Sequence, residues 1–139
     1  MANCSAQKAP LIQVHQPTIV AFFPPVTQAE LSKEPDTNES LNDFQLYVAQ
    51  ARQPLEKEGI NLKVIYARRF QIRRGNTVTT VMPKKVQVGY YFVAPDKKPL
   101  MENGVMTDAD LLQVAGEYFG TSIPLPKRIP PTDRRLPSR

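Results

Sequence analysis

The segment from Val88 to Gly120 constrains the fold of this chain more than any other part of it. It begins with the run VGYYFVA, whose β-branched and aromatic residues predict a strand that is buried on both faces. Pro95 to Lys98 is a turn signal, and Pro99 to Asn103 predicts an edge strand that runs back. Thr107 then caps a helix that ends at Gly120. We therefore expect an antiparallel strand pair followed by a packed helix.

Three further elements are expected upstream of this segment. Pro17 to Phe23 predicts a second buried strand, which two consecutive prolines stop. Ser40 to Glu58 carries an apolar stripe at helical spacing, with Ser40 as its N-cap. Asn61 to Ile72 has apolar residues at alternate positions over most of its length and predicts one long strand. A strand–helix–strand connection joins parallel strands, so we expect a mixed sheet with helices on both faces.

A β-hairpin is expected between the long strand and the last strand pair, over about residues 67–85. Arg74-Gly75-Asn76 is a turn signal, and the sequence from Thr77 to Val81, TVTTV, is strongly β-prone. Because the hairpin lies between two predicted core strands, we interpret it as an insertion that extends beyond the main sheet.

The order of these elements resembles the thioredoxin-like superfamily. The resemblance rests on VAFF before the first helix and on GYYFV, APDKK, PL and ENG before the last one, and it spans about Ile12 to Gly120. It implies an α/β fold, a three-layer sandwich with a mixed central sheet and helices on both faces. The pattern looks most like exported bacterial members of the superfamily.

The residues that carry out redox chemistry in that superfamily are not present at the matching positions of this sequence. Its Cys-x-x-Cys motif would fall close to Pro24 to Gln28, which here is Pro-Pro-Val-Thr-Gln, and its cis-proline would match Val88 and Gly89. Thiol–disulfide exchange requires a thiolate and normally a second, resolving thiol. Cys4 is the single cysteine of this sequence, so we expect a protein without redox activity.

The sequence contains no other recognisable catalytic or metal-binding motif. One cysteine and one histidine, His15, exclude a cysteine-based metal cluster and a two-histidine metal site within this chain. No Gly-rich phosphate loop and no Ser/His/Asp arrangement occurs. We expect no enzymatic activity, no cofactor and no metal, and an enzyme of unrecognised type is the weakest alternative.

Positive charge is concentrated in two segments, whereas Gln28 to Glu58 is rich in acids. Lys63 to Lys85 contains Lys and Arg but no Asp or Glu, and the tail at 121–139 is basic and proline-rich. Arginines beside an aromatic residue on a β-ribbon are suited to binding nucleic acid. If Phe70 instead packs inward, the arginines are simply a solvent-exposed face of the hairpin. The candidate partner-binding residues are Arg68, Arg69, Phe70, Arg73, Arg74, Lys127, Arg128, Arg134 and Arg135.

The first residues bear on localisation. Residues 1–11 lack apolar periodicity and are expected to form a flexible arm, in which no apolar leader core is visible. Cys4 suits the lipidated cysteine of a bacterial lipoprotein, tethered to a membrane, although Asn3 is a poor residue before it. An unreactive thiol is the alternative. The bacterial periplasm or cell envelope is slightly favoured over the cytoplasm, and no stretch is apolar over the roughly 18 residues of a membrane span.

The sequence thus predicts one domain at 12–120, between the arm at 1–11 and a disordered tail at 121–139. The expected function is a protein-binding or assembly module without redox activity, whose contact elements are the hairpin and the tail. A nucleic-acid-binding accessory protein that uses the basic hairpin at 68–74 is the first alternative.

Overall fold

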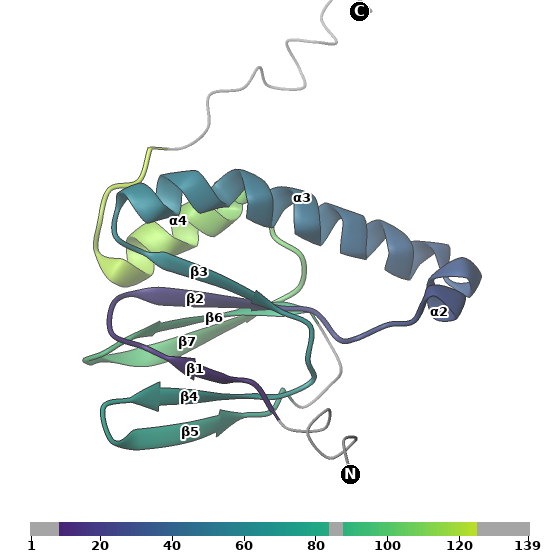
Figure 1. The fold of residues 1–139 in the computed structure, drawn as a ribbon. Coiled ribbons are helices and arrows are strands. Elements are labelled where there is room, and N and C mark those ends of the chain that lie inside the picture. The colour runs from purple at the N-terminus through teal and green to yellow at the C-terminus, as the bar shows by residue number, and fades with distance from the viewer. Residues whose placement is uncertain (1–8, 84–87, 125–139) are drawn as a thin grey trace, which may run out of the picture.

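The computed structural model describes residues 9–83 and 88–124, and within these ranges the chain forms two β-sheets and three helices (Figure 1). The larger sheet has four strands, in the spatial order β3 (Asn61–Ile65), β2 (Thr18–Phe22), β6 (Gly89–Ala94) and β7 (Lys97–Asn103). The smaller sheet has three strands, in the order β1 (Leu11–Gln13), β4 (Phe70–Arg74) and β5 (Thr77–Val81).

The four-stranded sheet is mixed, as the sequence predicts. β2 runs parallel to β3 and antiparallel to β6, and β6 is antiparallel to β7. β2 and β6 occupy the centre of this sheet, and every residue of both strands is buried. This burial explains why their sequences are continuous apolar runs rather than alternating ones. The chain is therefore an α/β protein with a mixed sheet.

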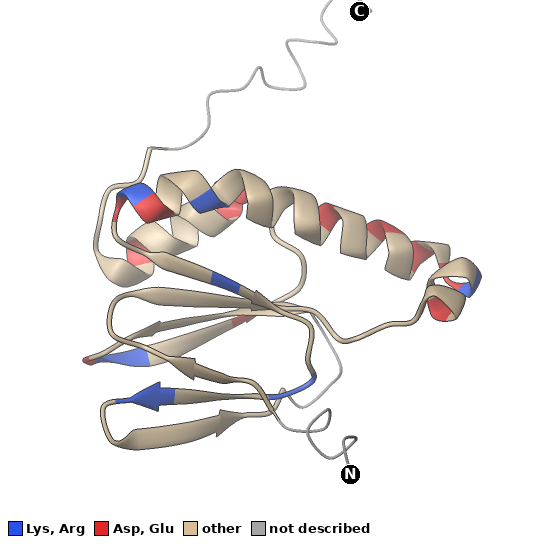
Figure 2. Cartoon of the chain, viewed as in Figure 1, with Lys and Arg blue, Asp and Glu red and all other residues tan. Residues whose placement is uncertain are grey.

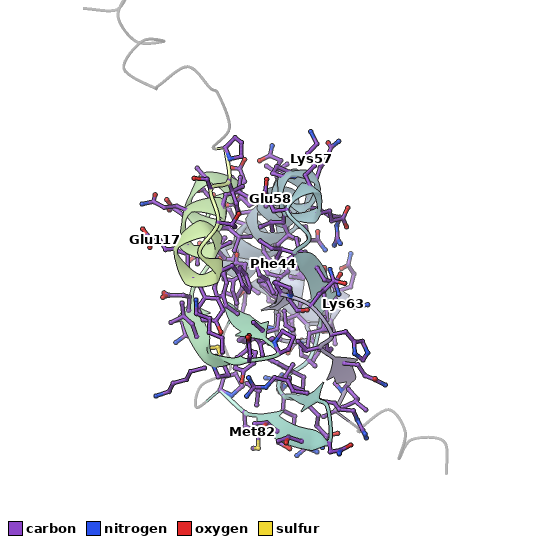
Figure 3. The ribbon with its side chains drawn as sticks, turned by 90° about the vertical axis from the view of Figure 1, so that its left-hand side faces the viewer. Phe44, Lys57, Glu58, Lys63, Met82 and Glu117 are labelled. Carbon is purple, nitrogen blue, oxygen red and sulfur yellow. The ribbon has the colours of Figure 1, made fainter. Side chains whose placement is uncertain are left out.

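Two helices cover one face of the four-stranded sheet. α3 (Pro35–Lys57) connects β2 to β3, and α4 (Asp108–Phe119) follows β7. Their apolar stripes meet the sheet in a core that contains Phe44, Leu55, Tyr90 and Leu111. In the view of Figure 3 the helices lie above the sheet, and Phe44 points into the space between them.

The opposite face of the four-stranded sheet is covered by the three-stranded sheet. Val20, Phe22, Tyr91 and Val93 from the larger sheet pack against residues of the smaller one, namely Ile12, Val14, Phe70, Ile72 and Val81. The layers are therefore helix, sheet and sheet (Figures 1 and 3). The prediction of helices on both faces is wrong for the described residues. The sequence contains few apolar stripes of helical period. The second face of the four-stranded sheet is therefore covered by three short strands instead of helices.

The predicted long strand from Asn61 to Ile72 is two strands in two different sheets. Leu62 on β3 packs toward the helices, whereas Phe70 and Ile72 on β4 pack between the sheets. Residues 66–69 carry the chain from one layer to the other. The alternating pattern continues through this crossing because both strands turn their even-numbered side chains toward a core, β3 toward the helices and β4 toward the other sheet.

The helix ends follow from capping residues. α3 begins at Pro35, five residues before the predicted N-cap at Ser40, because proline is well accommodated at the first helical position. α2 (Gln28–Lys33) is a short exposed helix that Thr27 and Glu30 close with a reciprocal capping box. The Thr27 backbone N–H donates to the Glu30 carboxylate at 2.7 Å, and this bond holds the pKa of Glu30 below its ordinary value.

The last helix matches its prediction. The Asp110 backbone N–H donates to the Thr107 side chain at 3.1 Å, which caps the helix start. Gly120 ends the helix in the left-handed conformation, with φ of 71°. None of the helices in the described ranges is both long and apolar enough to cross a membrane.

Candidate functional site

The three-stranded sheet has one buried face and one open face. Strand alternation places Ile12, Phe70, Ile72 and Val81 inward. The outer face is lined by the residues between them, whose cross-strand partners the register gives: Leu11 beside Gln71, Gln13 beside Arg73, Gln71 beside Thr80, and Arg73 beside Val78. Leu11 and Val78 are 45% and 44% exposed, so this face combines apolar, amide, hydroxyl and guanidinium groups.

β5 forms an open edge of this sheet. In the described residues β5 pairs with β4 alone. On β4, the Gln71 N–H donates to the Pro10 carbonyl at 2.8 Å and the Arg73 carbonyl accepts from the Val14 N–H at 2.9 Å, so both groups point toward β1. The residues opposite them on β5, Val78 and Thr80, are therefore non-hydrogen-bonded partners across β4–β5.

The backbone N–H and C=O groups of Val78 and Thr80 consequently point away from β4, toward the open side. The β4–β5 turn agrees with this alternation. Gly75, with φ of 60°, occupies the first central position of a two-residue turn, as in a type II′ hairpin. Exposed edges are usually guarded by proline, lysine or a bulge, whereas the sequence of β5, TVTTV, contains neither proline nor a charged residue. Among residues 9–83 and 88–124, β5 thus presents backbone donors and acceptors that no neighbouring strand pairs.

The residues of the basic hairpin do not form one cluster. Phe70 is 0% exposed and packs against the rings of Phe22 and Tyr91, with centroids 5.3 and 5.7 Å away. Phe70 is therefore occupied by the core and is removed from the candidate contact residues. Arg74 donates to the backbone carbonyls of Ala94 and Lys97, at 3.1 and 2.8 Å, and so ties the hairpin to the β6–β7 turn.

The remaining arginines are exposed and have different surroundings. Arg68 lies in the β3–β4 connection and contributes, after Thr27, to the lowered pKa of Glu30. Arg73 shares the alternation of Gln71 and therefore belongs to the outer face of the three-stranded sheet. Arg69 directly precedes β4 and lines a hollow on that face with Gln71 and Thr80. Figure 2 shows blue on β4 and on the connection before it, and no red on β1, β4 or β5.

A hollow opens on the outer face beside β5. Its volume is about 460 Å³, and Ala9, Arg69, Gln71 and Thr80 line it. The lining brings a guanidinium, an amide and a hydroxyl together without a carboxylate. Such a group of donors suits an anionic or strongly accepting ligand group.

A second cavity lies beyond the end of β2, near the start of α3. Its volume is about 480 Å³, and its lining includes Phe23, Pro24, Thr37, Ser40 and Val88. The lining also contains Asp36, and the Thr37 hydroxyl donates to the Glu34 carboxylate at 3.0 Å.

Several predicted residues lie outside the described ranges. They are Cys4, the candidate for lipidation, and the tail cations Lys127, Arg128, Arg134 and Arg135. Within the described residues, no group of three or more His, Cys, Asp or Glu side chains is arranged to hold a metal ion, and no peptide bond is cis.

Gln71, Val78 and Thr80 are surface groups that the sequence patterns did not single out. A signal for them existed in TVTTV, because a strand of three threonines and two valines has no strongly apolar face and suits an exposed edge. Comparison of the chain with protein-family models, with curated protein sequences and with solved structures gives no match.

Proposed function

We propose that this protein is a redox-inactive, thioredoxin-like protein-binding module that receives an extended segment of a partner along the open edge of β5. Addition of a strand to an exposed sheet edge is a common mode of peptide recognition, in which backbone hydrogen bonds supply affinity and side-chain pockets supply specificity. The observation that carries the proposal is the uncharged edge of β5, where Val78 and Thr80 direct their backbone groups outward.

The thioredoxin-like part of the proposal is supported by connectivity. The four-stranded sheet has the order β3-β2-β6-β7, α3 connects its two parallel strands, and an antiparallel β6–β7 pair leads into α4. Both helices pack on one face of this sheet. The three-stranded sheet then covers the face where the resemblance implies a further helix.

The absence of redox activity is supported by the residues at the expected position of the motif. β2 ends at Phe22 and is followed by Phe23, Pro24 and Pro25, and no thiol occurs there. A lone cysteine at position 4 has no resolving thiol in this chain. An insulin-reduction assay that shows turnover would contradict this part of the proposal.

Nucleic-acid binding is less well supported by the same surface. Single-stranded nucleic acid is usually held by a basic groove together with aromatic side chains on which bases stack. Phe70 is buried and Arg74 is bonded to backbone carbonyls. The outer face of the three-stranded sheet therefore keeps two arginines, Arg69 and Arg73, and no exposed aromatic residue of the hairpin.

The test is selection of peptides on the intact chain from a random peptide library, followed by binding to edge variants. Val78→Pro removes an outward N–H while the β4–β5 ladder is kept, since proline is tolerated on the open side of an edge strand. Val78→Thr is the matched control, because it keeps the N–H and a β-branched side chain. Equal thermal unfolding of the two variants shows that the fold is retained.

We expect selected peptides to bind the wild type and Val78→Thr, and to bind Val78→Pro at least about tenfold more weakly because backbone pairing at the edge is lost. Amide hydrogen exchange at Val78 and Thr80 should slow when the peptide is bound. Peptides that bind all three proteins equally, with no added protection of these two amides, would refute strand addition at β5.

A further inference from the structure

We infer that the segment received by β5 is acidic, and that one of its carboxylates enters the hollow formed by Arg69, Gln71 and Thr80. This inference rests on the proposed strand addition at β5. It goes further by naming the chemistry of the partner and the residues that select for it.

The charge of the surface around β5 has one sign. From Gly59 to Pro95 the chain contains Lys and Arg but no Asp or Glu, and β1 carries no charged residue. Arg69 and Arg73 therefore face the outer side of the sheet with no acid on β1, β4 or β5 to neutralise them. A partner with carboxylates next to this face gains attraction, and a basic partner is repelled.

The register indicates where such carboxylates would lie. Arg73 is opposite Val78 and Gln71 is opposite Thr80, so a strand added beyond β5 has Val78 or Thr80 between it and β4. Two strand spacings of about 4.8 Å separate the added strand from β4. An arginine and a glutamate side chain extend far enough to meet across that distance above a short side chain such as Val78 or Thr80.

The hollow offers groups that complement a carboxylate. Arg69, Gln71 and Thr80 line it together with Ala9, in a volume of about 460 Å³. A guanidinium binds a carboxylate through two parallel N–H donors, while the amide and the hydroxyl can donate to its remaining lone pairs. An uncharged glutamine side chain at the same place would lose the charge-assisted part of this interaction.

The experiment uses synthetic peptides and the intact chain. The probe is a fluorescein-labelled peptide of about nine alternating valine and glutamate residues, the length of an ordinary strand. A second peptide has glutamine in place of every glutamate. A third is N-methylated at every residue and therefore has no backbone N–H with which to pair as a strand. Binding is measured by fluorescence anisotropy over a series of NaCl concentrations.

The protein variants are Arg69→Gln and Arg73→Gln, with Lys63→Gln as the control. Lys63 is exposed on β3 in the other sheet, so this control changes the net charge by the same amount at a different place. Val78→Pro is included to report on strand pairing itself. Thermal unfolding of each variant confirms that binding is compared among folded proteins.

We expect the glutamate peptide to bind about tenfold or more tightly than the glutamine peptide, with an affinity that falls as salt rises. Arg69→Gln and Arg73→Gln should each weaken it by about three- to fivefold, as expected for exposed ion pairs. Lys63→Gln should change it by less than about twofold, and the N-methylated peptide and Val78→Pro should abolish most of the binding.

Other outcomes separate this inference from the proposed function. Equal binding of the glutamate and glutamine peptides, lost in Val78→Pro, would overturn the acidic partner and leave strand addition in place. A concentration-dependent dimer that Val78→Pro abolishes would show that a second copy occupies the edge, which also overturns the acidic partner. Absence of binding by every peptide would overturn both ideas.

A nucleic acid is tested in the same assay. A labelled single-stranded oligonucleotide of similar length is titrated against the wild type and the two arginine variants. Binding of this oligonucleotide that is tighter than that of the glutamate peptide, and that Arg69→Gln and Arg73→Gln weaken, would overturn the inference in favour of nucleic acid.

Discussion

Replacement of Phe70 by alanine tests whether the hairpin is an integral layer of the fold or a free arm. Phe70 is fully buried between the two sheets. Its ring lies 5.3 Å from that of Phe22 on β2 and 5.7 Å from that of Tyr91 on β6. A contact residue for a partner would be exposed, so its removal would affect binding and leave stability nearly unchanged.

The expected cost follows from this burial. A buried phenylalanine replaced by alanine loses about 3–5 kcal/mol of folding free energy, through lost transfer free energy and the cavity left behind. The two ring pairs add to this loss, because aromatic pairs at such distances contribute beyond their buried area. We therefore expect about 4 kcal/mol, a large part of the roughly 5–15 kcal/mol that keeps an ordinary domain folded.

The assay is equilibrium unfolding in urea, together with thermal unfolding followed by circular dichroism. Phe70→Ala should lower the melting temperature by about 10 °C or more, at roughly 3 °C per kcal/mol for a chain of this size. The control is Leu46→Ala on α3, where the side chain is 51% exposed, and its effect should stay within about 0.5 kcal/mol. A loss below about 1 kcal/mol for Phe70→Ala would refute the packing of the second sheet.

Three further predictions concern the elements around this core. Arg74→Gln should cost about 1–3 kcal/mol in urea unfolding, because two backbone carbonyls at the β6–β7 turn lose a charged donor. Gly89→Ala should lower the melting temperature at a cost of about 1–3 kcal/mol, since a Cβ would lie 2.7 Å from the ring of Phe22 and 2.9 Å from a backbone oxygen. Burial raises the pKa of Tyr90 above its ordinary value of 10.0, so its contribution to stability is complete below pH 10 and is lost as pH rises further. Tyr90→Phe should therefore lose stability less steeply with pH above pH 10. At neutral pH it should cost about 1 kcal/mol, because the Met106 N–H loses the hydroxyl that accepts its hydrogen bond at 3.0 Å. A dependence of stability on pH above 10 that equals that of the wild type would contradict the raised pKa of Tyr90.

The candidate site could be predicted only in part. The basic segment was visible in the sequence, but its residues serve different roles, since Arg74 holds a turn and Phe70 fills the core. Which arginines face outward depends on the register of β4 in the second sheet. The open edge of β5 likewise depends on which strands pair, and pairing joins segments far apart in the chain.

The local elements follow from the order of the amino acids alone. Continuous apolar runs gave the central strands β2 and β6, the stripe from Leu41 to Leu55 gave most of α3, and Thr107 and Gly120 bounded α4. These features depend on capping residues, turn residues and the local pattern of apolar residues. Such short-range signals act in the same way wherever the segment lies in the fold.

The stacking of the layers, in contrast, depends on contacts between segments that are far apart in the chain. The chain crosses from β3 to β4 between Ile65 and Phe70, and this crossing sends one continuous alternating pattern into two sheets. The two-residue alternation of a strand shows which side chains share a face of the sheet. It does not show which neighbouring layer that face packs against. The second sheet, its outer arginines and the open edge of β5 all follow from that crossing.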